Sequence, residues 1–233
     1  MSLQEFALKC WEIFSNPSNW ESLLKGASIS LLVATFALII GIILGILGSS
    51  MKMSKNRFLR ILGNIYVEVI RGTPMLLQIS VFYLVIPTLI TVITQESFRV
   101  NKLVMGTIAI GINSGAYCTE LIRSGIVGID TGQWEACKAL NLSYFDSMRY
   151  VILPQAFKQV IPPLVSEYIT LIKDSSLLST IGVMDLLFSA QIIGANYYNY
   201  MAPLMMASLL YLVMTLLTSL AAKKIEGRLA ESD

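Results

Sequence analysis

The sequence contains no histidine, which excludes histidine-based catalytic triads, histidine general bases and zinc sites with histidine ligands. Its three cysteines, Cys10, Cys118 and Cys137, are odd in number and far apart, so they indicate neither a disulfide framework nor a paired-cysteine metal site. No phosphate-binding loop of the G-x-x-x-x-G-K-[S/T] type occurs, so any nucleotide chemistry must come from another chain. A net charge of +2 without a basic arm does not indicate a nucleic-acid partner.

Charged residues are also scarce. They make up only 14% of the 233 residues, whereas soluble domains carry about 25%. Hydrophobic residues make up 55% of the chain, and the mean hydropathy is +0.68. This composition predicts an integral membrane protein with little equipment for catalysis.

Long runs without charge indicate the membrane spans, because about 20 apolar residues cross the roughly 30 Å hydrocarbon core of a bilayer. We predict an all-α membrane protein with five transmembrane helices. The fourth run is interrupted by three charged residues, Glu167, Lys173 and Asp174. The predicted spans are 26–51, the run between Arg71 and Glu96, the run between Lys102 and Glu120, 160–182, and a fifth that starts near Pro203 and ends at 222.

The first 25 residues form a separate amphipathic segment. Its apolar side chains recur at helical spacing, with two tryptophans nearby, which is typical of a helix that lies on a membrane surface and leads into the first span. An ordered extension packed on the other helices is the equally weighted alternative. The residues of this pattern are Leu3, Phe6, Cys10, Ile13, Trp11 and Trp20.

The distribution of lysine and arginine predicts the orientation, because these residues concentrate in cytoplasmic loops. They are frequent in loop 52–60, in segment 123–159 and in the tail 223–233, whereas the opposite side holds Lys9, Lys25, Arg99 and Lys102. We therefore place the N-terminus outside and the C-terminus in the cytoplasm. The predicted organisation is an N-terminal segment 1–25, a transmembrane domain 26–222 that contains segment 123–159, and a cytoplasmic tail 223–233.

Segment 123–159 has the pattern of two short helices joined by a turn. Asp130 and Gln133 have the spacing of a capping box, which predicts a helix through Leu140. Asn141 then suits a left-handed helix end. A second helix is predicted to begin at Ser143 and Asp146 and to stop before Pro154. Such a compact unit is suited to docking on a partner, although an ordinary structured loop explains the same pattern.

The segment Glu135-Ala136-Cys137, followed at fixed spacing by Asn141, Val151 and Leu153-Pro154, resembles the EAA motif of ABC importer permeases. The family pattern is EAA, three residues, Gly, nine residues, Ile, one residue and Leu-Pro. The chain departs from it at Cys137, Asn141 and Val151. Two further segments, 67–78 and 173–177, resemble the VExxRGTPLLVQ and KDTSL motifs of polar amino-acid permeases of the histidine, glutamine and arginine type.

This resemblance implies a type I ABC importer transmembrane domain in a bacterial cytoplasmic membrane. The EAA segment would be a coupling helix seated on a separate ATPase dimer, which would bind ATP and magnesium, so that this chain itself would hold no cofactor or metal and would not be an enzyme. A second permease chain, identical or related, would complete the pathway, and an extracytoplasmic binding protein would deliver the amino acid. The implied ATPase-coupling residues are Gly132, Gln133, Glu135, Ala136, Ala139 and Asn141.

The fourth span holds the candidates for the substrate path or gate. Charges inside a membrane are costly and usually face the protein interior or a wet cavity. An amino-acid zwitterion needs an anionic partner for its ammonium group and a donor for its carboxylate. Direct substrate contact and a shared gate or subunit interface both fit. The candidates are Glu167, Thr170, Lys173, Asp174, Ser175 and Ser176.

Two pairs of opposite charge have the i, i+3 spacing of one helix face, Glu68 with Arg71 and Glu120 with Arg123. Structural or gating roles are favoured for both pairs over substrate contact. The alternative function is a free-standing ion-coupled transporter or channel with Glu167 and Asp174 as its ion sites. Such a transporter would have no need of a docking segment at 130–154.

Overall fold

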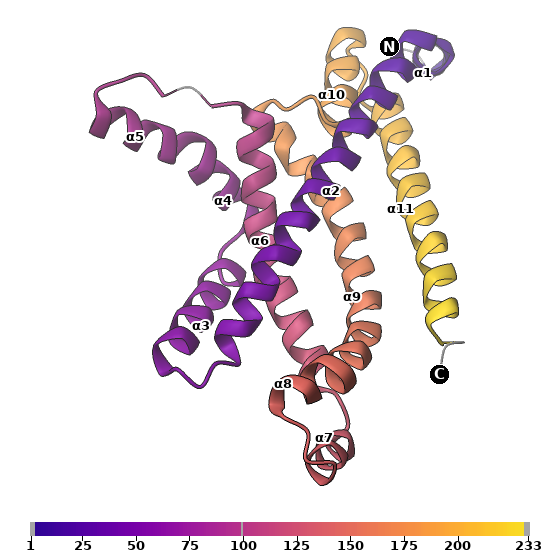
Figure 1. The fold of residues 1–233 in the computed structure, drawn as a ribbon. Helices are drawn as coiled ribbons and strands as arrows, with labels where there is room; N and C mark the ends of the chain where they lie inside the picture. Colours follow the sequence, from indigo (N-terminus) through magenta and orange to yellow (C-terminus); the bar gives the residue numbers. More distant parts are fainter. Residues whose placement is uncertain (1–2, 99, 231–233) are drawn as a thin grey trace. The chain divides into compact units, whose positions relative to one another are not determined.

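A computed structural model describes residues 3–98 and 100–230 of the chain, and these residues are almost all helical, without a β-strand (Figure 1). Arg99 and the end of the predicted tail, residues 231–233, lie outside the described residues. The α-helices are α1 (Leu3–Ser15), α2 (Pro17–Lys52), α3 (Arg57–Arg71), α4 (Met75–Ser80), α5 (Ile86–Thr94), α6 (Lys102–Val127), α7 (Thr131–Ala139), α8 (Tyr144–Ser147), α9 (Leu153–Asp174), α10 (Leu186–Tyr197) and α11 (Met201–Ala230). Two π-helical turns, η1 (Val81–Val85) and η2 (Met148–Ile152), and a 3-10 helix, η3 (Ser175–Ile181), continue them.

Helices cover all the predicted spans, but α6, which covers the third, is not among the segments that pass a test of length and hydropathy for crossing a membrane. Within the described residues, three segments are long and apolar enough to cross a membrane, and a bent pair, 144–181 with 186–197, makes a fourth if it is one span. The three are Pro17–Lys52, Met75–Thr94 and Met201–Lys224. The five-span topology therefore stays a prediction. The predicted domain boundaries at residues 25 and 222 fall inside α2 and α11 and also stay predictions.

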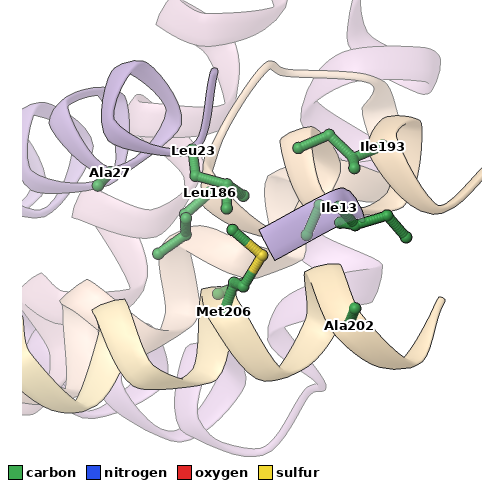
Figure 2. Packing of buried hydrophobic residues seen from close by; sticks show 9 residues of the cluster. Ile13, Leu23, Ala27, Leu186, Ile193, Ala202 and Met206 are labelled. Carbon is green, nitrogen blue, oxygen red and sulfur yellow. The ribbon is translucent and has the colours of Figure 1, made fainter. Parts of the chain in front are cut away.

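The chain divides into two compact units. The first unit comprises 1–37, 74–110 and 169–218, and the second comprises 38–73, 111–168 and 219–233. In the first unit, Ile13 of α1 is fully buried in one apolar cluster with Leu23 of α2, Leu186 and Ile193 of α10, and Met206 of α11 (Figure 2). The prediction that the N-terminal segment packs on the other helices is thus confirmed. The apolar residues Leu8, Trp11 and Phe14 of α1 are exposed, and the placement of α1 on a membrane surface stays a prediction.

In the second unit, a stripe of glycines on α2 packs closely against α6. A Cβ atom on Gly41 would lie 2.6 Å from the Oγ of Ser114, and a Cβ on Gly45 would lie 2.5 Å from the Cβ of Cys118. Small residues let helix backbones approach closely, and in a membrane such contact replaces the hydrophobic driving force between helices. Glycine is therefore needed at these two positions for space.

Two prolines follow π-helical turns at the same distance. Pro87 comes two residues after η1, and Pro154 comes two residues after η2. In each turn an amide bonds to a carbonyl five residues earlier, Ile86 to Val81 and Leu153 to Met148. A proline ring clashes with the carbonyl four residues before it in an α-helix, and the wider π turn relieves this clash. The predicted helix end before Pro154 is therefore wrong, because α8, η2 and α9 run on through it.

Two helices were not predicted as separate elements. Residues 57–60 were interpreted as part of a loop, yet they begin α3, which Asn56 caps by accepting a hydrogen bond from the amide of Phe58. The second is α10, which begins at Asp185, whose side chain accepts from the amide of Phe188. Both caps are local sequence signals. They were missed because the spans were predicted from the positions of charged residues.

Candidate functional site

The two short helices of the candidate coupling segment 123–159, α7 and α8, lie at one end of the second unit, beside the end of α6 and the start of α9 (Figure 1). A small buried cluster of Ile126, Ile129, Ile152 and Ala156 anchors it, and Trp134 packs against this cluster. The segment is therefore attached to the membrane helices through a defined core.

The first helix of this segment, α7, begins as predicted but by a different hydrogen bond. The Asp130 carboxylate accepts from the amide of Gly132 at 2.7 Å. Gln133 does not complete a capping box, because its side-chain Oε1 accepts a hydrogen bond from the side-chain Nε2 of Gln155 at 3.0 Å. The predicted capping box is corrected in this respect: Gln133 ties α7 to α9 instead of capping its own helix.

The turn after α7 is left-handed, as predicted. Asn141 has a φ of 52°, and the amides of Asn141 and Leu142 bond to the carbonyls of Lys138 and Cys137, both at 3.0 Å. These two bonds form the Schellman ending of a helix, in which asparagine is the usual substitute for glycine. The next helix begins at Ser143, whose hydroxyl oxygen accepts from the amide of Asp146 at 3.1 Å.

The outer face of the segment exposes small, charged and aromatic side chains together. All the implied coupling residues except Gln133, which is half-buried, are exposed. Leu140, Tyr144 and Phe145 are exposed as well, and the ring of Tyr144 stacks on Trp134 with the centroids 6.2 Å apart. Several large apolar side chains exposed in one short segment favour a protein-contact site. The exposed coupling residues are Gly132, Glu135, Ala136, Ala139 and Asn141.

One path candidate lies in the second unit. Glu167 is half-buried, and its carboxylate accepts a hydrogen bond from the hydroxyl of Ser114 at 2.8 Å. Ser114 itself is fully buried on α6. A carboxylate held by a hydrogen bond to a neighbouring helix satisfies the rule that charges in a membrane face a polar interior. The partner Ser114 was missed in the sequence because it is 53 residues away.

The other five path candidates lie in the first unit, where α9 ends and η3 begins. Thr170 and Lys173 are exposed, and Asp174 and Ser176 are half-buried. Ser175 is fully buried, and its hydroxyl donates to the carbonyl of Ile172 at 2.7 Å, so this serine has a structural bond. The 3-10 helix η3 ends at Gly182, which has a left-handed φ of 73°, and the predicted end of the fourth span at this residue stays a prediction.

Of the two predicted charge pairs, the structure forms one. Arg123 contacts Glu120 at 3.0 Å, which confirms that pair, and Lys52 of α2 also bonds to the same carboxylate. In the part of the chain that the structure describes, Arg71 has no ion pair with Glu68; its guanidinium lies 5.0 Å from the ring centroid of Tyr117. Lys52 was missed because sequence spacing finds partners only along one helix.

Nothing among the described residues assembles a metal site, since they contain no group of three or more cysteines, aspartates and glutamates placed to hold an ion.

Comparison with known proteins identifies the family. Residues 37–231 match the model of the family described as binding-protein-dependent transport system inner membrane component. The chain is 39% identical over 207 residues to a Rickettsia prowazekii protein named as a glutamine transport system permease, GlnP, covering 89% of this chain and 92% of that one. It is 38% identical over 211 residues to the arginine transport system permease ArtQ of Bacillus subtilis, covering 91% and 94%.

A crystal structure of an amino acid ABC transporter with histidines matches with a TM-score of 0.85 and 34% identity over 93% of this chain and 98% of that chain. The inward-facing MetNI methionine ABC transporter matches at 0.71 with 19% identity over 92% and 99%, a likeness of fold alone. The chain therefore belongs to the family of inner membrane components of binding-protein-dependent transport systems, and it has the type I ABC importer permease fold.

Proposed function

We propose that the chain is the membrane-spanning permease subunit of an ATP-driven importer of polar amino acids. Relatives named for glutamine, arginine and L-cystine transport support this substrate class, as does the matching transporter structure with histidines. The chain has no nucleotide-binding loop of its own. Its energy must therefore enter from outside the chain, through a surface that a second protein can move.

The observation that carries this proposal is the exposed coupling segment. Its two short helices have fixed ends, with Asp130 and Ser143 as caps and Asn141 as the left-handed turn. The core below it connects its motion to α6 and α9 of the same unit. A segment that is rigid, exposed and attached to membrane helices suits the transmission of a closing movement of an ATPase pair, which would bind ATP and magnesium.

The remaining parts of the assembly follow from the family. A second permease chain would face this one, an extracytoplasmic binding protein would deliver the amino acid, and the complex would lie in a bacterial cytoplasmic membrane. The five-span topology, with the N-terminus outside and the C-terminus in the cytoplasm, belongs to this proposal. It places the coupling segment on the side where an ATPase finds ATP.

For the substrate, Glu167 is the stronger candidate, because its carboxylate is half-buried and oriented by Ser114. It would pair with the ammonium group of an amino acid that crosses the membrane. For residues 170–176, with both Lys173 and Asp174, we favour a gate or subunit interface, and the hydroxyl of Ser175 already donates to the carbonyl of Ile172.

The test is purification of the tagged chain from its native cells in mild detergent, with every co-purifying protein identified by mass spectrometry. We expect a stoichiometric ATPase subunit with the unmodified chain and none with Glu135→Lys. The matched control is Glu12→Lys, which reverses an exposed charge on α1 and should retain the ATPase. The chain alone, still transporting in vesicles without ATP, would establish the ion-coupled alternative instead.

A further inference from the structure

The second unit contains a cavity of about 1080 Å³ between the end of α2, the end of α6, η2 and the start of α9. This volume is at the upper limit of small-molecule pockets, which measure about 300–1,000 Å³. Its wall is apolar over most of its extent, with side chains such as Ile42, Ile46, Met148, Phe157 and Leu164. An apolar cavity does not hold ordered water, so at membrane depth its natural filling is hydrocarbon.

Apart from Tyr144, the polar residues of the lining lie in one short stretch of chain that contains Ser49, Ser50, Ser54 and Lys55. The hydroxyls of Ser49 and Ser50 donate to the carbonyl of Ile46, at 3.0 and 2.7 Å, so these two serines offer acceptors and no anion-binding hydrogen. Lys55 supplies the positive charge of this polar end.

Lys55 is exposed, and among the described residues no carboxylate lies within ion-pair distance of it. The neighbouring Lys52, by contrast, is engaged by Glu120. Between residues 53 and 67 the sequence contains further cations, Arg57 and Arg60, and no aspartate or glutamate. The polar end of the cavity is thus basic, and basic pockets between membrane helices on the cytoplasmic side are typical sites for anionic lipid headgroups.

We propose that this cavity binds an anionic phospholipid of the surrounding membrane, with its acyl chains along the apolar wall and its headgroup phosphate on the ammonium group of Lys55. The separation of one cationic end from a long apolar wall matches an amphiphile. The lining residues among those that the structure describes include no aspartate or glutamate, which favours an anionic headgroup over a cationic one. Because Tyr144 and Met148 belong to the wall, a bound lipid contacts α8 and η2, the part of the coupling segment that continues into α9.

The test is native mass spectrometry of the purified, delipidated transporter complex titrated with phosphatidylglycerol and, separately, with phosphatidylcholine of identical acyl chains. We expect phosphatidylglycerol to bind about fivefold more tightly, because one cation near a membrane surface attracts an anionic lipid by about 1 kcal/mol, which corresponds to that ratio of affinities. Lys55→Glu should remove this preference. Lys223→Glu, a reversal of an exposed cation that does not line the cavity, should preserve it.

A second pair of variants tests the apolar wall. Ile46 lines the cavity and Ile43 does not, although the two lie on the same helix and are 52% and 55% exposed. Ile46→Trp should abolish binding of the lipid, whereas Ile43→Trp should leave it intact. Equal binding of the two lipids by the unmodified protein, or a photo-crosslinker at position 46 that captures the second permease chain and no lipid, would overturn the proposal. Both outcomes are independent of transport, so they do not depend on the proposed substrate.

Discussion

Replacing Asn141 tests how strongly the left-handed turn between α7 and α8 controls the coupling segment. Its φ of 52° places a side chain where L-residues pay a steric cost of about 1–2 kcal/mol, which glycine avoids and asparagine partly offsets. A β-branched residue is an outlier at such an angle. We therefore expect Asn141→Val to destabilise the turn by about 2 kcal/mol, equivalent to about a 30-fold change in the population of open turn. Asn141→Gly should change it by less than about 1 kcal/mol, since glycine relieves the strain but loses more chain entropy.

Hydrogen exchange of the amides of residues 131–147 in the purified permease measures this opening directly. The amides of Asn141 and Leu142, which close the end of α7, should exchange faster in Asn141→Val by about that factor. Leu140→Val is the control, because Leu140 is exposed with an ordinary φ of −80°. Asn141→Val should also lose its association with the ATPase, and Asn141→Gly should keep it. If valine and glycine at position 141 gave the same exchange rates, the backbone angle would have no such control.

Three further changes address the rest of the second unit. Gly45→Leu should prevent the close approach of α2 and α6, because even a Cβ would lie 2.5 Å from the Cβ of Cys118. Overpacking of this kind costs about 1–3 kcal/mol or more, and size-exclusion chromatography with a thermal shift assay measures the loss of stability. Glu167→Gln should lower uptake of radiolabelled amino acid at least about tenfold, with Ser114→Ala having a smaller effect, whereas normal uptake by Glu167→Gln would remove this carboxylate from the path. Ser143→Ala removes the cap of α8, worth about 1 kcal/mol, and should speed proteolysis within residues 143–152 about fivefold; an unchanged rate would show that the cap is dispensable.

Features that depend on neighbours in sequence were predicted well. The long uncharged runs correspond to α2, to α4 with α5, and to α11. The turn at Asn141 and the cap at Ser143 are local as well, because each is made by a side chain or backbone angle within a few residues. The family resemblance itself rests on such short motifs.

Contacts between distant segments were not predictable from one sequence. Lys52 and Glu120 are 68 residues apart, and Ser114 and Glu167 are 53 apart, so no helical periodicity relates them. The pairing of Gln133 with Gln155 overrode a capping box that local spacing favoured. The helix through Pro154 was missed because the rule that proline ends a helix assumes α geometry, which η2 abandons for one turn.

The π turn η2 also explains why the EAA motif fixes the number of residues between its positions as well as the residue types at them. An α-helix advances by about 100° per residue, so a single residue inserted into or deleted from 148–152 would rotate the following helix by that angle. Glu167, further along α9, would then point away from Ser114, and Ala156 at the start of α9 would turn away from the core of the coupling segment. The spacing between Asn141 and Leu153-Pro154 thus fixes the rotation of α9 about its own axis relative to α7.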